Sequence, residues 1–219
     1  MSQDNKFPKI TGKELDRLKK LLGLDIDLKD PFNRYATPDT IRHFVHGIGD
    51  TNPLFTDEEY GTATRWGSIV APPTFLFSCF GRGAPQGLRG IHSMWAGAHF
   101  KMRSSITSGT EIRGTVALTK LEEKISRFAS KTVHQEHTYT FTNIDKEMIG
   151  KVREWHIRTE RDTARIRGQH NLLEPAQYTR DDIARIFADY EHEEVRGAAP
   201  RYWEDVTKGE DIPQVVKGP

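Results

Sequence analysis

The sequence predicts an α+β protein, and three observations lead to that prediction. Apolar residues recur at helical intervals in the first part of the chain. From residue 91 to residue 159 the chain changes to stretches rich in Thr, Val, Ile and aromatic residues, which favour strands. Helical spacing of apolar residues returns after residue 179. We therefore expect the middle of the chain to build an antiparallel sheet, with helices before and after it.

Two amphipathic helices are expected before this sheet. Residues 11–14 (Thr-Gly-Lys-Glu) have the spacing of a capping box, and apolar residues follow at helical intervals: Leu15, Leu18, Leu21 and Leu22. Residues 37–38 (Thr-Pro) form a second helix start, with an N-cap and a proline in the first turn. Gly47 and Gly49 close this second helix, so Asp50 is expected just beyond a helix end.

A third helix is expected to be buried. Pro72-Pro73-Thr74 can open a helix, and the following residues, Phe75 to Phe80, are apolar on every side. A short helix without a polar face must lie inside the protein. A run of this length could also form a buried strand.

Four antiparallel strands are expected next: Ile91 to Ser105, Glu111 to Leu121, Arg127 to Thr142 and Met148 to Thr159. The third strand alternates most clearly, because its even-numbered positions from His134 to Thr142 are mostly polar. The opposite face carries Val133, Gln135, His137, Tyr139 and Phe141. Residues 143–146 (Asn-Ile-Asp-Lys) are expected to join the last two strands as a hairpin.

The last part of the chain reads as an extension of the main domain. The charged run from Arg161 to Gly168 is typical of a solvated connector, and Thr179 is expected to cap a helix from Asp181 to Glu194. We therefore divide the chain into a domain over residues 1–160 and an extension with one helix and a linker-like tail over residues 161–219.

Composition excludes several classes of function. Charged residues make up 29% of the 219 residues, the mean hydropathy is −0.66, and no apolar run approaches the ~20 residues that span a bilayer. The first residues lack the pattern of a secretory signal, so the cytoplasm is the expected location. A net charge of +1 does not indicate a nucleic-acid partner. We expect no metal and no cofactor. No histidine pair has helical metal-binding spacing with a companion carboxylate. The single cysteine, Cys79, cannot form a cysteine-cluster metal site or an internal disulfide.

Residues 49–55 (Gly-Asp-Thr-Asn-Pro-Leu-Phe) hold the most informative local pattern. Asp and Asn side chains bond to the backbone two residues further on, and proline fixes the next bend, so the segment reads as a turn. On that interpretation Asp50 only stabilises a loop. A carboxylate at this position could also act as a general base.

The surrounding sequence resembles the N-terminal domain of the MaoC-like dehydratase family. The resemblance lies in residues 36–60 (ATPDTIRHFVHGIGDTNPLFTDEEY) and 65–77 (RWGSIVAPPTFLF). Residues 195–206 (VRGAAPRYWEDV) also resemble the segment that leads into a second domain in longer relatives. The resemblance implies a hot-dog fold, in which the sheet wraps around the helix that starts near Pro73. It also implies hydration of 2-enoyl-CoA or dehydration of 3-hydroxyacyl thioesters.

Two departures from the family pattern affect the expected chemistry. Asp50 and Asn52 match the catalytic motif, but Phe55 stands where the catalytic relatives have histidine, and phenylalanine cannot transfer a proton. Pro73 stands where they have a glycine whose N–H binds the thioester carbonyl, and proline has no N–H. The resemblance therefore implies that this chain is a degenerate half, meaning a subunit that lacks part of the catalytic machinery. Such a half shapes the tunnel for the acyl chain and pairs with a second hot-dog subunit.

The substrate expected from the resemblance is acyl-CoA or a thioester on a carrier protein. Arg65 and Arg82 are candidates for binding coenzyme A phosphates. Phe75, Phe77 and Phe80 are candidate tunnel walls, although core packing alone explains them equally well. The expected substrate-binding set is Phe55, Arg65, Pro73, Thr74, Phe75 and Arg82.

Three alternatives to a degenerate half remain open. The chain could be a complete homodimeric enzyme that uses Asp50 with another base, for which His46 and His99 are the first candidates. It could be a non-catalytic subunit that binds acyl thioesters. A thioesterase is also compatible with the fold.

Overall fold

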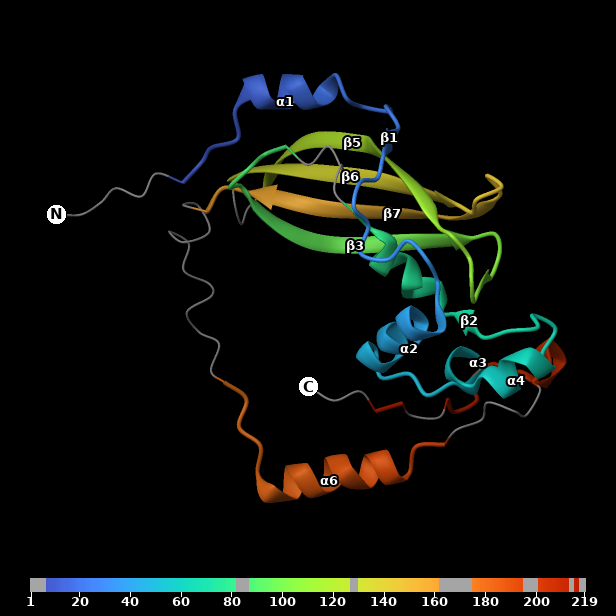
Figure 1. Ribbon diagram of the computed structural model, residues 1–219. Helices are drawn as coiled ribbons and strands as arrows, with labels where there is room; N and C mark the ends of the chain where they lie inside the picture. The colour runs from blue at the N-terminus through green and yellow to red at the C-terminus, as the bar shows by residue number, and fades with distance from the viewer. Residues whose placement is uncertain are drawn as a thin grey trace.

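The protein is built around one five-stranded antiparallel sheet (Figure 1). The computed structural model describes residues 7–81, 87–126, 130–161, 175–194, 201–212 and 215–216. The strands, in the order in which they lie side by side, are β1 (Ile26–Asp27), β5 (Arg113–Ser126), β6 (Ser130–Thr142), β7 (Met148–Thr159) and β3 (His92–Met102). The four long strands confirm the predicted ones. The two-residue strand β1 was not predicted, because so short a segment carries no readable periodicity.

The helices begin where the capping residues predict. Thr11, Thr37 and Thr179 each accept a backbone hydrogen bond at the start of their helices. The helices, in chain order, are α1 (Gly12–Lys19), α2 (Pro38–Gly47), α3 (Pro53–Thr56), α4 (Glu58–Ala63), the 3₁₀ helix η1 (Pro73–Cys79), α6 (Arg180–Glu191) and the 3₁₀ turn η2 (Trp203–Asp205). A separate two-stranded ladder joins β2 (Val70–Ala71) to β4 (Ile106–Thr107). The short helices α3 and α4 and this ladder were not expected from the sequence.

Two hydrophobic clusters lie on one face of the sheet, which we call the inner face. The larger cluster surrounds η1 and includes Phe75 and Phe141, which are fully buried. The smaller cluster packs α1 onto the sheet through Leu15, Leu18 and Leu118. The buried central helix is therefore confirmed. It is a 3₁₀ helix; Phe77 within it and Phe80 directly after it are half-buried.

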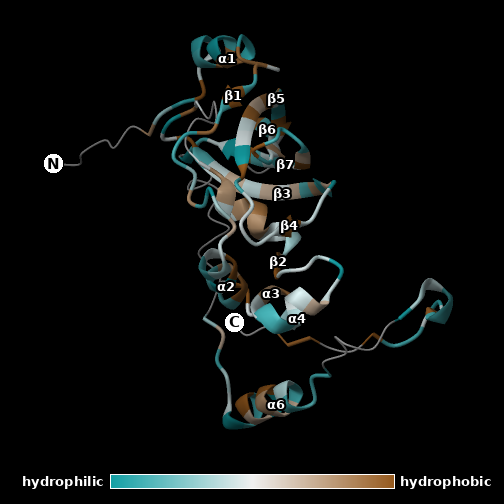
Figure 2. Ribbon diagram, turned by 45° about the vertical axis from the view of Figure 1, so that its right-hand side comes forward, coloured by the Kyte–Doolittle hydropathy of each residue, from teal (hydrophilic) through white to brown (hydrophobic). Residues whose placement is uncertain are grey.

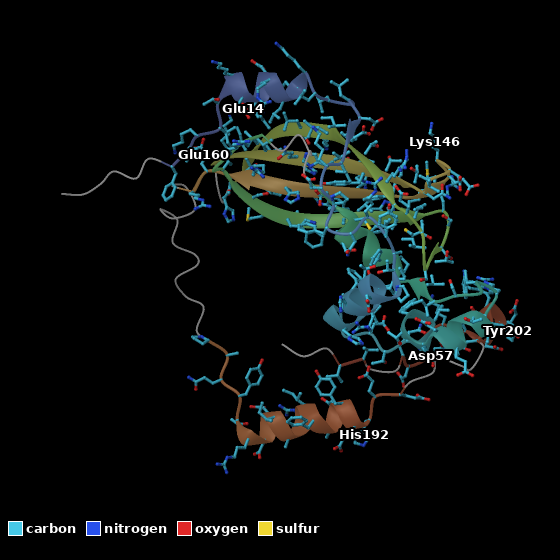
Figure 3. The ribbon with its side chains drawn as sticks, viewed as in Figure 1. Glu14, Asp57, Lys146, Glu160, His192 and Tyr202 are labelled. Atoms are coloured by element: carbon cyan, nitrogen blue, oxygen red, sulfur yellow. The ribbon has the colours of Figure 1, made fainter. Side chains whose placement is uncertain are left out.

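The alternation predicted for β6 is confirmed. Its odd-numbered residues from Val133 to Phe141 are all buried, while the even-numbered residues from His134 to Thr142 are partly exposed. The hairpin after β6 is also confirmed, since Asn143 N donates to Glu147 O across the turn. Figure 3 shows Lys146 at this turn and Glu160 beyond the opposite end of β7. There Glu160 accepts hydrogen bonds from Lys9 Nζ and Ile10 N, and so ties the segment before α1 to the sheet.

The helix α6 stands apart from the sheet in Figure 1 and keeps an exposed apolar side. It ends at Glu191, three residues before the predicted end. Ile183, Phe187 and Tyr190 are all exposed, and Figure 2 shows brown apolar and teal polar parts on this helix. Most of the charged connector predicted from Arg161 to Gly168 lies outside the described residues, so the division after residue 160 stays a prediction. Within the described residues, no helix is both long and apolar enough to cross a membrane.

Candidate functional site

The motif segment forms a tight turn between α2 and α3. Gly49 has a φ of +63°, a conformation that glycine adopts without strain. Asp50 Oδ1 then accepts a hydrogen bond of 2.9 Å from the Asn52 backbone N–H, and Asn52 Oδ1 accepts one of 3.0 Å from Leu54 N. Both motif side chains therefore hold the turn together, as the local sequence predicted.

Phe55 extends from this turn into the protein. It is half-buried and packs against the cluster around η1, whereas Asp50 is half-buried and Asn52 is exposed. The structure thus brings the three motif positions together in one short segment. Position 55 therefore carries a hydrophobic side chain that packs against the core.

The start of η1 lies close to α2. Pro73 and Thr74 are exposed there, and the Phe75 backbone N–H donates to Pro72 O at 2.8 Å. The Phe75 ring is fully buried and meets Phe44 of α2 edge to face, with 5.5 Å between ring centroids. Because Pro73 has no N–H and the Phe75 N–H is engaged, neither group can bind a thioester carbonyl in this arrangement.

Of the two predicted coenzyme A contacts, Arg65 lies in the described part of the chain. The Arg65 guanidinium lies over the Trp66 ring, 4.3 Å from its centroid, and the Arg65 side chain is exposed. Such stacking is a common arrangement for a surface arginine. Arg82 lies outside the described residues.

The histidines singled out from the sequence lie on the surface. His46 is exposed on α2. His99 is exposed on β3, and its neighbours Ala98 and Phe100 pack against the cluster around η1. Since successive side chains of a strand point to opposite faces, His99 lies on the outer face and the sheet separates it from η1.

An aromatic strip runs along η1 toward β3. Phe77 meets Phe100 with 4.7 Å between ring centroids and Trp95 with 6.4 Å. Phe80 stacks on Tyr139 of β6 with 4.0 Å between centroids. Trp95 remains 59% exposed, so the strip continues from the core to the surface.

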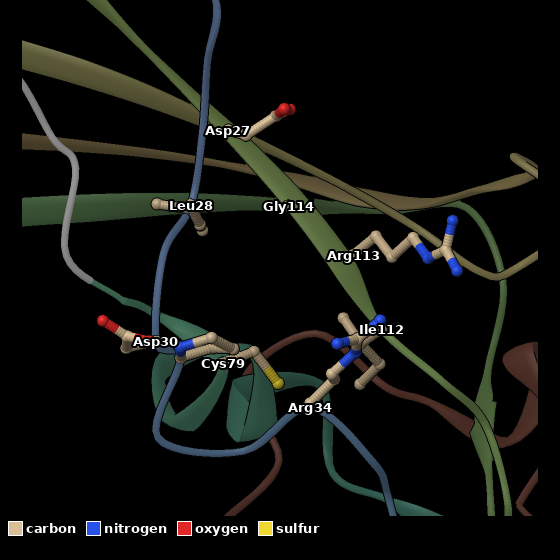
Figure 4. Close-up of a pocket in the computed structure, with 9 residues that line it drawn as sticks. Asp27, Leu28, Asp30, Arg34, Cys79, Ile112, Arg113 and Gly114 are labelled. Atoms are coloured by element: carbon tan, nitrogen blue, oxygen red, sulfur yellow. The ribbon is translucent and has the colours of Figure 1, made fainter.

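A cavity of about 550 Å³ opens on the other side of η1, toward β1 and β5 (Figure 4). Arg34 and Arg113 lie on its rim, and both bind Glu111 Oε1, at 2.8 Å and 3.1 Å. Burial raises the pKa of the Cys79 thiol to about 12, so the thiol in this cavity is protonated at neutral pH. The lining residues are Asp27, Leu28, Asp30, Pro31, Arg34, Cys79, Ile112, Arg113 and Gly114. The two arginines were not foreseen, because their positions in the sequence have no motif spacing.

A row of polar side chains crosses the inner face between the two hydrophobic clusters, and we call it the polar row. Tyr139 OH donates to Glu154 Oε1 at 2.8 Å, and the same oxygen lies 3.6 Å from His156 Nε2. His156 Nδ1 lies 2.9 Å from Ser93 Oγ. This row was not predicted from the sequence, although the polar residues at inward positions of β6 were a visible sign of it.

Glu154 carries the negative charge of the polar row. Burial raises the pKa of this carboxyl, but the neighbouring His156 and the hydrogen bond from Tyr139 outweigh burial and leave the pKa below its ordinary value. Burial and the neighbouring carboxylate raise the pKa of Tyr139. Glu154 is therefore ionised and Tyr139 neutral at physiological pH.

The comparisons with known proteins agree with this architecture. Residues 29–149, more than half of the 219-residue chain, match a family described as "FAS1-like, dehydratase domain region". A UPF0336 protein of Thermobifida fusca is 28% identical over 131 residues, which cover 51% of this chain and 84% of the relative. A UPF0336 protein of Streptomyces avermitilis is 41% identical over 46 residues, and this match covers 21% of this chain and only 31% of the length of the relative.

Solved structures with the same fold include a chain of the ChsH1–ChsH2 complex from Mycobacterium tuberculosis. Its TM-score is 0.53 at 16% identity, over 68% of this chain and 90% of that chain. A MaoC-like dehydratase gives a TM-score of 0.51 at 17% identity, over 74% of this chain and 50% of that chain. At these identities the likeness establishes the fold, which is the α+β hot-dog fold implied by the resemblance.

Proposed function

The chain belongs to the FAS1-like dehydratase-region family, and from that premise we propose that it is one half of a hydro-lyase acting on acyl thioesters. The reaction is the reversible hydration of a 2-enoyl-CoA, or of the corresponding thioester on a carrier protein. In this proposal the chain contributes the acyl-binding surface and a second hot-dog subunit contributes the catalytic pair. The observation that carries the proposal is the position of Phe55, which fills the proton-transfer place of the motif and packs into the core.

The start of η1 supports the same assignment. A hydratase needs a donor for the enolate oxygen, and the loss of one such donor costs about 3 kcal/mol of transition-state stabilisation. Here Pro73 has no N–H and the Phe75 N–H is bonded to Pro72 O. A chain that lacks both a proton-transfer histidine and this donor is better suited to shaping a site than to catalysis.

The edge of the sheet supports a partner subunit. β3 is eleven residues long and lies at the end of the strand order, so within the described sheet only β7 pairs with it. Unpaired strand edges in stable proteins are usually covered. A second hot-dog subunit is the occupant that we propose for this edge, and the similar chain from Mycobacterium tuberculosis was itself solved as part of a ChsH1–ChsH2 complex.

The test is hydration of a medium-length 2-enoyl-CoA by the chain alone, followed as formation of the 3-hydroxyacyl-CoA by mass spectrometry. We expect no hydration by the wild-type chain, together with quenching of tryptophan fluorescence when the acyl-CoA binds. The Asp50→Asn variant keeps an acceptor for the Asn52 N–H and removes the carboxylate, so it is the matched control.

Two outcomes would contradict the proposal. Clear turnover that disappears in Asp50→Asn would identify a self-sufficient enzyme in which another group replaces the missing histidine. Absence of both turnover and binding, in protein shown to be folded by circular dichroism, would remove acyl-CoA as the ligand of this chain.

A further inference from the structure

Ser93, Glu154 and His156 share the inner face of the sheet by strand register. Trp95 lies opposite His156 and Ser93 lies opposite Arg158, so alternate residues of β3 and β7 face the same side. Tyr139 of β6 also points to this side, because it is part of the cluster around η1. The polar row is therefore a tertiary arrangement drawn from three strands, and none of its members belongs to the motif turn.

The two neighbours of His156 in the row favour one tautomer of its ring. Oε1 of the ionised Glu154 lies 3.6 Å from Nε2, so its charge favours the ring proton on that nitrogen. Nδ1 is then an acceptor, and the Ser93 hydroxyl at 2.9 Å donates to it. This is the arrangement in which a histidine can remove the hydroxyl proton of a serine.

The exposed fraction of the side chain decreases from Ser93 through His156 to Glu154. A serine that is activated by a histidine and a carboxylate requires this order, with the serine outermost. Ser93 is exposed, the His156 side chain is 24% exposed, and the Glu154 side chain is 12% exposed. The Tyr139 ring beyond Glu154 is buried. The hydroxyl can therefore meet a substrate, while the carboxylate that orients the histidine is shielded from water.

A buried arginine lies opposite the serine in the strand register. Arg158 pairs with Ser93 and is only 9% exposed. One guanidinium nitrogen donates to Leu88 O at 2.9 Å, while Nε has no hydrogen-bond partner among the described residues. A buried guanidinium that bonds to no carboxylate in the described part of the chain favours negative charge nearby, such as the oxyanion formed when a hydroxyl attacks a carbonyl.

An apolar surface adjoins the serine on the same strand. Trp95 is exposed and meets Phe77 of η1. A register shift between Trp95 and Gly97 bulges the strand, and bulges of this kind change the direction of side chains next to functional sites. The aromatic strip from Trp95 to Phe77 can hold a hydrocarbon chain whose carbonyl lies over Ser93.

We propose that Ser93, His156 and Glu154 form a second reactive centre that hydrolyses acyl thioesters or esters through an acyl-serine. Ser93 Oγ attacks the carbonyl carbon, and its proton passes to His156 Nδ1. The carbon–sulfur or carbon–oxygen bond to the leaving group breaks, and the leaving thiol or alcohol takes that proton. Water then attacks the acyl-serine, with His156 as base, and releases the carboxylic acid and the free serine. Glu154 positions His156, and Tyr139 positions Glu154.

The test uses the full chain and a fluorophosphonate probe, which phosphonylates activated serines. We expect a single adduct, located on Ser93 by mass spectrometry of the digested protein. We also expect hydrolysis of a medium-chain 4-nitrophenyl ester. Both reactions should disappear in Ser93→Ala and slow by about 10²-fold or more in His156→Gln, because a general base contributes on that order.

Ser104→Ala is the matched control. Ser104 is also an exposed serine near β3, but its hydroxyl donates to Met148 O instead of to a histidine. This variant should be labelled as fast as wild type. In a second measurement, the Ser93→Cys variant should react with iodoacetamide at least tenfold faster than the Ser104→Cys variant, because His156 promotes the thiolate.

The proposal is overturned if folded wild-type protein takes up no fluorophosphonate, or if the adduct is found away from Ser93. Equal alkylation of the two cysteine variants would likewise show that His156 does not activate position 93. None of these results depends on hydration of 2-enoyl-CoA, since Asp50 and Phe55 take no part in the relay. Failure of one proposal therefore leaves the other standing.

Discussion

The motif turn and the polar row both hold potential catalytic groups, and they are built in opposite ways. In the motif turn, Asp50 and Asn52 lie two residues apart and each accepts a bond from the backbone N–H two residues further on. In the polar row, Ser93, Tyr139 and Glu154 come from three strands and are linked through side chains. The hydrogen bonds of the motif turn are explained by the turn that they stabilise. The hydrogen bonds of the polar row stabilise no turn and no helix cap.

A recognisable motif and a reactive geometry therefore need not coincide in one chain. Asp50 lies in the motif that resembles the family pattern, but its carboxylate accepts a hydrogen bond from the backbone, and Phe55 cannot transfer a proton. His156 carries no pattern in the sequence, but its two ring nitrogens face a carboxylate and a hydroxyl. Experiments that separate structural from chemical roles should affect the two regions differently.

The largest effect is expected at the helix that touches both regions. Phe75 of η1 contacts α2 just before the motif turn, and Phe80, the residue directly after η1, stacks on Tyr139 of the polar row. Phe75→Ala should lower the free energy of unfolding by about 3–5 kcal/mol, because it leaves a cavity in a fully buried place. Urea denaturation measures this loss. A change below about 1 kcal/mol would mean that η1 does not organise the core in solution.

The next largest effect is expected within the polar row. Tyr139→Phe keeps the ring stacked on Phe80 but removes the donor to Glu154, which should cost about 1.5–3 kcal/mol of unfolding free energy. Glu154→Gln and the double variant complete a mutant cycle. A coupling of about 0.5 kcal/mol or more is expected for groups in one network. Strict additivity would show that the row is not a connected unit.

A smaller effect is expected in the motif turn. Asn52→Ala removes the N-cap of α3 and should cost about 1 kcal/mol, while Asn52→Ser retains a capping oxygen and should cost only a few tenths. Thermal unfolding of the two variants side by side measures the difference. If both variants were equally destabilised, the Asn52 side chain would be needed for something other than its cap.

The effect that is smallest at neutral pH, where it is absent, develops only in alkaline solution. Burial raises the pKa of Cys79 to about 12 from an ordinary value of 9.0, and burial also raises the pKa of Tyr139. Above about pH 9 the unfolded chain therefore binds fewer protons than the folded chain, so the free energy of unfolding falls as pH rises. Urea unfolding at about pH 8 and about pH 10.5 should show this decrease, and Cys79→Ala should reduce it. A stability that is flat or rises over this range would contradict the burial of these groups.

The helix starts and strand faces could be predicted because they depend on neighbours in the chain. Thr37 caps its helix through the backbone three residues on, and the burial of alternate residues of β6 follows from the two-residue repeat of a strand. The two-residue strand β1 and the ladder between β2 and β4 could not be predicted in this way. They exist only because a distant segment lies alongside them.

The features of the candidate sites also divide into those that depend on nearby residues in the chain and those that depend on distant segments. The amino-acid sequence alone is enough to establish the α+β class, the turn at Asp50 and the absence of a histidine at position 55, since each depends on residues within a few positions of one another. The folded chain was needed to decide between a helix and a strand after Pro73, to place Phe55 against the core and to place Ser93 beside His156. Ser93 and His156 are 63 positions apart in the chain, and the antiparallel register of β3 with β7 is what brings their side chains together.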